Sequence, residues 1–226
     1  LINIIRSNNK YEFIRVGALE AFQNACPDST DVLKQLLEDI HVGTINDDDC
    51  RLRGMLLDKL YPDIIKPDEI LHYLVNSPEN VISRYFMFVH HDLVKRTPAS
   101  DLPKLIDTVA ISDPLNRCDS EEITNKHMWE GFIGKLLVKT ITEYGNNCPA
   151  SDLYRWLGLA VNKYGHVKID REESEAVRSW FEKHPGRIFD LFEYWFSITA
   201  PDDLQKKERH FWERLHRVRS PITTCH

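Results

Sequence analysis

Glycine is scarce in this sequence, at 9 of 226 residues. A sheet of many short strands needs glycine in its tight turns, so this scarcity favours long helices. The five cysteines lie far apart, are odd in number and form no C-x-x-C pair, which argues against a disulfide framework or a structural zinc site. The sequence also contains no apolar run near 18 residues and no signal peptide. These absences predict a reduced, cytoplasmic, helical protein.

The charge of the chain is acidic overall but unevenly distributed. The net charge is −6, so bulk electrostatics do not favour nucleic acid or an anionic membrane as a partner. Residues 204–226 carry six Lys or Arg and two Glu, a net charge of +4, which leaves −10 for the rest of the chain. We interpret this basic run as a solvent-exposed helix face, with a docking patch for an acidic neighbour as the alternative. The expected partner is a protein or the rest of the same polypeptide.

Apolar residues recur at helical spacing in about ten segments that are joined by short polar stretches. Residues 11–25 form the first clear helical stripe, which Pro27 ends. The segments HVGTI and GHVKI resemble strands but are too short to seed a sheet. The pattern predicts an all-α fold of layered antiparallel helix pairs, an irregular HEAT-like or α-solenoid array. Four tryptophans fall on helical stripes and are expected in the core: Trp156, Trp180, Trp195 and Trp212.

Local signals predict where individual helices begin and end. Thr30 and the aspartates at 47–49 are expected to cap the helices that follow them, and Asp170 with Glu173 suggests a capping box. Gly145 is expected to end a helix in the left-handed conformation. The turn-rich stretch after residue 111 predicts two sub-domains, residues 1–111 and 112–226. The character of both chain ends suggests a fragment of a longer protein.

The helix ends between residues 51 and 221 carry a family resemblance. One helix ends in Leu-aromatic-Pro, an acidic-capped helix ending in Leu follows, and a Tyr-x-x-Phe helix and an Asp-Leu-Pro helix start come next. This order resembles the helical region that follows the nucleotide-binding core in bacterial NACHT-type STAND ATPases. The segments HMWEGFIGKLLVKTITEY and FWERLHRVRSP are similar to later parts of that region. The matching positions are Leu60, Tyr61, Pro62, Glu69, Leu74, Tyr85, Phe88, Asp101, Leu102 and Pro103.

The resemblance implies a non-catalytic HEAT-like sensor or interaction domain of a signalling NTPase, with anti-phage defence as one setting. The ATPase would lie outside this chain, and no catalytic, cofactor or metal residue is assigned within it. The segment GFIGKLL is the nearest approach to a phosphate loop. Gly131 and Gly134 have two residues between them where that loop needs four, and Leu136 follows Lys135 in place of Ser or Thr. We therefore expect the two glycines to serve close helix packing.

Two metal-site alternatives remain beside this interpretation, together with a plain scaffold role. The first is an all-α HD-like metal-dependent phosphohydrolase, in which His72, His91 and Asp92 would hold a divalent ion that activates water. Asp107 or Asp113 would complete that set. The second is a di-iron bundle, which needs a carboxylate and an imidazole three residues apart on each of two helices. Its candidate ligands are Glu69 with His72, Glu213 with His216, and Glu130 and Glu143.

Overall fold

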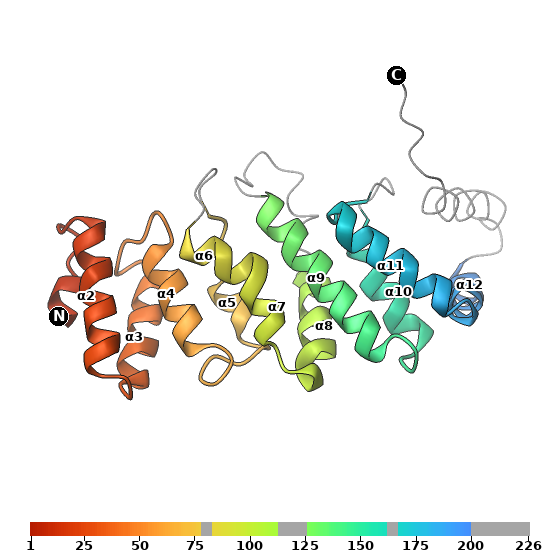
Figure 1. Cartoon of the computed structure of the whole chain (residues 1–226), viewed down its shortest axis with the longest axis horizontal. Helices are drawn as coiled ribbons and strands as arrows, with labels where there is room; N and C mark the ends of the chain where they lie inside the picture. Colours follow the sequence, from red (N-terminus) through yellow and green to blue (C-terminus); the bar gives the residue numbers. More distant parts are fainter. Residues whose placement is uncertain (78–82, 113–125, 162–166, 200–226) are drawn as a thin grey trace, which may run out of the picture.

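The computed structural model describes residues 1–77, 83–112, 126–161 and 167–199 (Figure 1). Within these residues the regular structure is helical, which confirms the predicted all-α fold. In the segment GHVKI, Val167 forms an isolated β-bridge with Val161. None of the described helices is both long enough and apolar enough to cross a membrane.

A π-helical turn, η1, connects α6 to α7 without a break, and a short 3-10 turn, η2, precedes α8. The elements in chain order are α1 (Ile2–Ile5), α2 (Glu12–Ala25), α3 (Thr30–His41), α4 (Arg51–Leu60), α5 (Ile70–Tyr73), α6 (Arg84–Met87), η1 (Phe88–Asp92), α7 (Leu93–Arg96), η2 (Ala99–Asp101), α8 (Leu102–Ser112), α9 (Lys126–Tyr144), α10 (Ala150–Gly158), α11 (Arg171–Lys183) and α12 (Gly186–Ile198).

The helices stand side by side in one row, with α2 near one end and α12 near the other (Figure 1). In one series of contacts α2 packs on α4, α4 packs on α6 and η1, η1 and α7 pack on α9, and α9 packs on α11. In a second series α8 packs on α10, and α10 packs on α12. Contacts of α8 and of α10 with α9 join the two series, and α3 packs on α4 of the first series. The result is a layered set of helix pairs, while its assignment to the HEAT-like class stays a prediction.

One apolar core runs along the row and continues past residue 112, where the sequence predicts a boundary. The two predicted sub-domains therefore share a core, and the boundary between them stays a prediction. The predicted core tryptophans at 156, 180 and 195 are at most 8% exposed, and Trp212 lies outside the described residues. Fully buried side chains from several helices include Leu19, Leu33, Leu56, Phe88, Leu105, Phe132 and Leu153.

The Leu-Tyr-Pro corner at the end of α4 is held by hydrogen bonds to α7. Tyr61 is fully buried, and its hydroxyl hydrogen-bonds to the hydroxyl of Thr97. The guanidinium of Arg96 donates to the backbone carbonyl of Tyr61 and to Oδ1 of Asp58 at 2.8 Å. Asp58 also accepts a hydrogen bond from Arg84 at 2.6 Å. Charge-assisted bonds thus fix the end of α4 against both α6 and α7.

Of the predicted helix caps, the structure confirms the one at Asp47 and contradicts the one at Thr30. Asp47 caps α4 as expected, because its two carboxylate oxygens accept from the backbone N–H groups of Leu52 at 3.0 Å and Arg53 at 2.8 Å. The prediction for Thr30 is wrong. Ser29 occupies the N-cap position of α3 without a side-chain capping bond, and Thr30 is the first helical residue.

The prediction of a left-handed Gly145 is also wrong, since Gly43 is the only described glycine with a positive φ. Gly145 is needed for close packing instead. A Cβ atom there would lie 2.5 Å from the carbonyl oxygen of Ile141 and 2.7 Å from the indole ring of Trp180 on α11. The absence of a side chain lets α11 approach the end of α9.

The need for a residue without a side chain is stronger at Gly54, where α4 crosses α6. A Cβ atom at this position would lie 2.3 Å from the backbone nitrogen of Tyr85 and 2.6 Å from its Cα atom. Gly54→Ala is therefore expected to lower the free energy of unfolding by about 1–3 kcal/mol or more, because backbone atoms must move apart. Urea denaturation measures the change.

Gly17 on α2 provides the matched control, because it is an exposed helical glycine with nothing within 4 Å of the added Cβ atom. Gly17→Ala should raise the free energy of unfolding by up to about 1 kcal/mol, since alanine is the better helix former. Equal changes in the free energy of unfolding for the two substitutions would show that α4 and α6 pack less closely than the distances at Gly54 imply.

Candidate functional site

A group of titratable side chains lies at the π turn η1 and on the helix that packs against it. A π turn inserts an extra residue into an α-helix and is frequent at functional sites. The turn carries His90, His91 and Asp92 in succession, of which His91 is exposed and the other two are half-buried. Since η1 packs on α9, these side chains lie beside residues of that helix.

His90 lies between α6 and α9. Its ring stacks on Phe86, with centroids 5.1 Å apart. Its Nδ1 atom lies 3.1 Å from Nε2 of His91 and 3.2 Å from Nζ of Lys135. The imidazole occupies the space that Gly131 leaves free, because a Cβ atom on that glycine would be 2.2 Å from Nε2. The contact confirms that Gly131 serves close packing.

Gly134 has the same role one turn further along α9. A Cβ atom there would lie 2.9 Å from Cγ of Glu173 on α11. Glu173 is only 9% exposed, although the sequence suggests that it belongs to a capping box with Asp170. The predicted helix start is confirmed, because Asp170 occupies the N-cap position of α11, but the capping box is wrong, because the Asp170 side chain makes no capping bond.

Burial lowers the pKa of His90 to about 4, and the positive charges of Lys135 and His91 act in the same direction. The negative charge of Asp170 opposes them. The imidazole is therefore neutral at pH 7. A neutral ring accepts a hydrogen bond at one nitrogen, so Lys135 can donate to Nδ1.

Three oxygen and nitrogen ligands converge next to this group, at the start of α9 and the start of α11. Nδ1 of His127 lies 3.8 Å from Oε2 of Glu130 and 3.8 Å from Oδ1 of Asp170. One ligand atom from each residue lies within 4.8 Å of the other two, the single such triplet among the described residues. The His127 side chain is 76% exposed, whereas those of Glu130 and Asp170 are 19% and 32% exposed.

The structure does not bring together His72, His91 and Asp92, the residues of the HD-like alternative. The exposed ring of His72 on α5 packs against His41 of α3, with centroids 3.9 Å apart. His91 and Asp92 lie on η1, which packs on α9. No set of ligand atoms within 4.8 Å joins the three in the described part of the chain. His91 and Asp92 are adjacent in the sequence, but His72 does not lie close enough to share a metal ion with them.

Asp107, the optional fourth ligand of that alternative, ties α8 to α10. Its Oδ1 atom accepts hydrogen bonds from Nη2 of Arg155 and from Nε1 of Trp156, both at 2.7 Å. The indole ring of Trp156 is 2% exposed, so this carboxylate gives a buried donor its partner. Asp113 lies outside the described residues.

The di-iron alternative likewise finds no common centre among the residues that the structure describes. Glu69 occupies the N-cap position of α5, and its carboxylate accepts from the backbone N–H of Lys66 at 3.3 Å. Glu143 is exposed near the end of α9, whereas Glu130 lies near its start. Glu213, His216 and the basic run of residues 204–226 fall outside the described residues.

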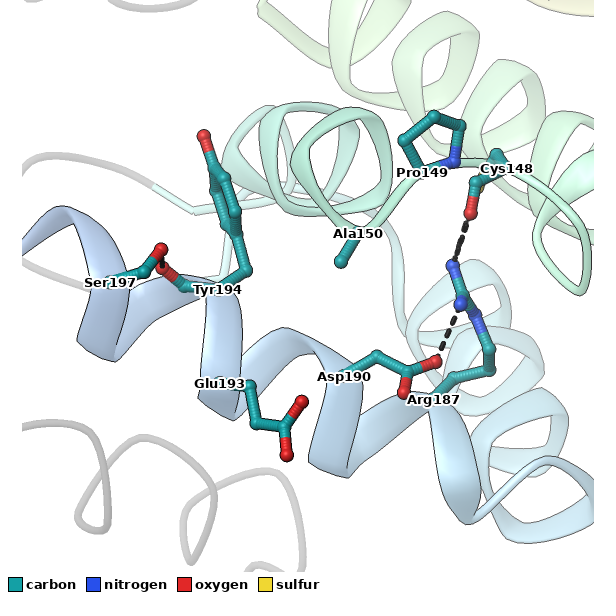
Figure 2. A pocket seen from close by; sticks show the side chains of 8 residues that line it. All are labelled: Cys148, Pro149, Ala150, Arg187, Asp190, Glu193, Tyr194 and Ser197. Carbon is teal, nitrogen blue, oxygen red and sulfur yellow. Dashed lines mark hydrogen bonds and ion pairs between the residues drawn. The ribbon is translucent and has the colours of Figure 1, made fainter.

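An open hollow of about 490 Å³ lies between the start of α10 and one face of α12 (Figure 2). Arg187 reaches across it, donating from Nη2 to the carbonyl of Cys148 and from Nη1 to Asp190, both at 2.6 Å. Figure 2 shows the guanidinium directed at these two partners. Glu193, Tyr194 and Ser197 complete the α12 side of the hollow. Because the charge of Arg187 is already paired, we interpret this residue as a tie between the two helices.

The sequence analysis did not select three residues of these two groups as site residues. They are His90 on η1, and His127 and Asp170 of the triplet at the starts of α9 and α11. The pair His127-x-x-Glu130 has a readable signal, because residues three apart share a helix face. Asp170 has none, since only the packing of α11 on α9 brings it close to His127.

Comparison with family models, with curated proteins and with solved structures finds no match to this chain. The resemblance to the NACHT-type ATPases rests on the positions named in the sequence analysis and stays a prediction.

Removing the carboxylate of Asp107 is expected to destabilise the α8–α10 junction. Asp107→Ala leaves the buried indole N–H of Trp156 without its acceptor, which should cost about 1–3 kcal/mol in the free energy of unfolding. Asp152→Ala is the control, because Asp152 accepts only from Arg155 in the described structure, at 3.0 Å. This exposed pair should contribute less than about 1 kcal/mol. Equal losses in urea denaturation would contradict the assigned role of Asp107.

Because the pKa of His90 is low in the folded state, its contribution to the free energy of unfolding decreases as the pH falls. The folded-state pKa of about 4 lies below the ordinary value of 6.5, so the unfolded chain binds more protons between these limits. The contribution of His90 to stability is therefore fully present above pH 6.5 and decreases as the pH falls towards 4. Lys135→Met should raise the pKa of His90 and reduce this decrease.

An NMR titration of the histidine ring signals measures the pKa of His90 directly. Lys139→Met is the control, since Lys139 lies on the same helix and donates to the carbonyls of Val94 and Thr97, both at 2.8 Å. It should leave the His90 titration unchanged. A pKa of His90 that is the same in the Lys135→Met variant and in the original chain would show that burial alone sets the value.

Proposed function

We propose that this chain is a non-catalytic helical sensor or interaction domain of a larger, cytoplasmic STAND-type signalling NTPase, with anti-phage defence as the implied setting. The observation that carries the proposal is the single row of helices, in which successive pairs pack on one another. A row of this kind exposes a long surface relative to its core and suits binding to another protein surface. The partner would be a separate protein or the rest of the same polypeptide.

Several charged side chains lie between neighbouring helices. They support a binding role because they keep the helices of the row in a fixed arrangement. Asp58 and Asp107 connect helices of the row, and Arg187 connects α12 to the segment just before α10. Lys139 adds a further connection, from α9 to the carbonyls at the end of α7. These charged groups are used to hold the helices in register.

The same hydrogen bonds between helices could transmit the effect of binding along the row. Asp58 joins α4 to α6 and α7, Lys139 joins α7 to α9, and Asp107 joins α8 to α10. A partner that binds one packing of two neighbouring helices more tightly than another shifts the population towards that packing. We propose that such a shift passes along the row to the ATPase core.

The natural reading frame tests the family assignment. Upstream of Leu1 it should encode a phosphate loop with four residues between its glycines and a Ser or Thr after the lysine, together with an acidic magnesium-binding motif. The full-length protein should hydrolyse ATP. Replacing the phosphate-loop lysine with alanine should reduce turnover by about a hundredfold or more, because that lysine contacts the transferred phosphate.

The chain of 226 residues should show no ATP turnover on its own under the same conditions. A reading frame without the two motifs would reject the STAND assignment. Hydrolysis of ATP or of a simple phosphate ester by the isolated chain would reject the non-catalytic role.

A further inference from the structure

The three ligand atoms of His127, Glu130 and Asp170 leave a gap of the size of a metal ion between them. Both carboxylate oxygens are 3.8 Å from Nδ1 of His127, which is beyond hydrogen-bonding distance. One ligand atom of each residue lies within 4.8 Å of the other two, and a point equidistant from three atoms that are 3.8–4.8 Å apart lies roughly 2.2–2.8 Å from each. Zinc bonds to histidine nitrogen and carboxylate oxygen measure about 2.0–2.2 Å, so a small contraction would satisfy them.

The position of Asp170 provides a second, independent observation. An aspartate at an N-cap normally accepts a hydrogen bond from the backbone of the following turn. Asp170 occupies that position in α11, but its side chain makes no capping bond and lies beside His127 of α9. A carboxylate directed away from its own helix, towards an imidazole on another, is available as a ligand.

We propose that His127, Glu130 and Asp170 bind one divalent transition-metal ion of the Zn²⁺ type at the junction of α9 and α11. One imidazole nitrogen and two carboxylate oxygens favour such an ion, because imidazole suits zinc and its neighbours better than it suits Mg²⁺ or Ca²⁺. Three protein ligands leave at least one coordination position for water or for a partner's side chain.

The charges of the two carboxylates also favour a cation. The starts of α9 and α11 both carry the partial positive charge of a helix N-terminus, which repels a cation. Two full negative charges from Glu130 and Asp170 outweigh these partial charges at short range. Without metal, a protonated His127 would attract both carboxylates, so a plain ion-pair group is the competing interpretation.

Bound metal would connect the first turn of α9 directly to the start of α11. This connection lies at the opposite end of α9 from the packing of Gly145 against Trp180. The two contacts together would fix α11 along α9. The metal site goes beyond the proposed sensor function and does not depend on it.

The test uses the 226-residue chain after removal of metal with a chelator. Isothermal titration with Zn²⁺ should show one equivalent bound, with weaker binding of Mn²⁺ and weaker binding still of Mg²⁺. His127→Ala and Asp170→Asn should each weaken Zn²⁺ binding at least tenfold. His127 is largely exposed and Asn keeps the shape of Asp, so both variants should fold, which far-UV circular dichroism verifies.

Two matched variants separate a built site from general binding to a chain with ten histidines. Glu172→Gln removes an exposed charge from the first turn of α11, and His91→Ala removes an exposed histidine from η1. Both should bind Zn²⁺ within twofold of the original chain. Saturating Zn²⁺ should raise the midpoint of thermal unfolding in these two variants but not in His127→Ala.

Equal Zn²⁺ affinity in all five proteins would overturn the proposal, and so would the absence of binding by the original chain. The plain ion-pair interpretation would then stand. Loss of the ion in His91→Ala instead of His127→Ala would also overturn it and place the metal at η1. These outcomes leave the ATPase test untouched, so the two proposals fail independently.

Discussion

Each helix of the row buries its apolar stripe only because another helix lies against it. Leu19 of α2, Leu33 of α3 and Leu105 of α8 are fully buried, although each belongs to a helix with one solvent-exposed side. Burying such a side chain contributes about 1.5–3 kcal/mol, far more than an exposed ion pair contributes. The apolar contacts therefore hold the row together, while the charged ties at Asp58 and Asp107 fix how neighbouring helices are aligned.

The demand for close contact explains why several of the described glycines lie where helices meet. Gly54, Gly134 and Gly145 each face atoms of another helix at a distance that no side chain would allow. At Gly54 the neighbour is backbone, which cannot move without shifting α6. At Gly134 the neighbour is the flexible side chain of Glu173, which can give way. The first contact is therefore a stricter determinant of the fold than the second.

The spacing of apolar residues predicts most of the helices, because a stripe that must be buried leaves a period in the sequence. The stripe expected at residues 11–25 corresponds to α2, and the Asp47 cap follows from local hydrogen bonding alone. The predictions of a cap at Thr30, of a left-handed conformation at Gly145 and of a capping box at Asp170 are wrong for different reasons. At Thr30 the cap position is shifted by one residue, whereas at Gly145 and Asp170 a contact between α9 and α11 overrides the local preference.

The candidate site was less predictable than the fold, since its residues meet only through tertiary packing. His91 and Asp92 are adjacent in sequence, yet His72 faces α3 and not η1. The π turn at Phe88–Asp92 leaves no mark on the apolar pattern, because Tyr85, Phe88 and Val89 fit an ordinary helix equally well. The proximity of Asp170 to His127 depends on how α11 lies on α9, which no single segment encodes.

The packing of Trp180 gives the molecule an intrinsic optical reporter. Its indole contacts the end of α9 at Gly145 and stacks on His184, with ring centroids 4.4 Å apart and planes inclined by 24°. Indole emission responds to the polarity and the ring contacts around it. A displacement of α11 along α9 would move this ring away from Gly145. The contribution of Trp180 to the emission of the chain, which has five tryptophans, therefore registers the spacing of α9 and α11 without any added label.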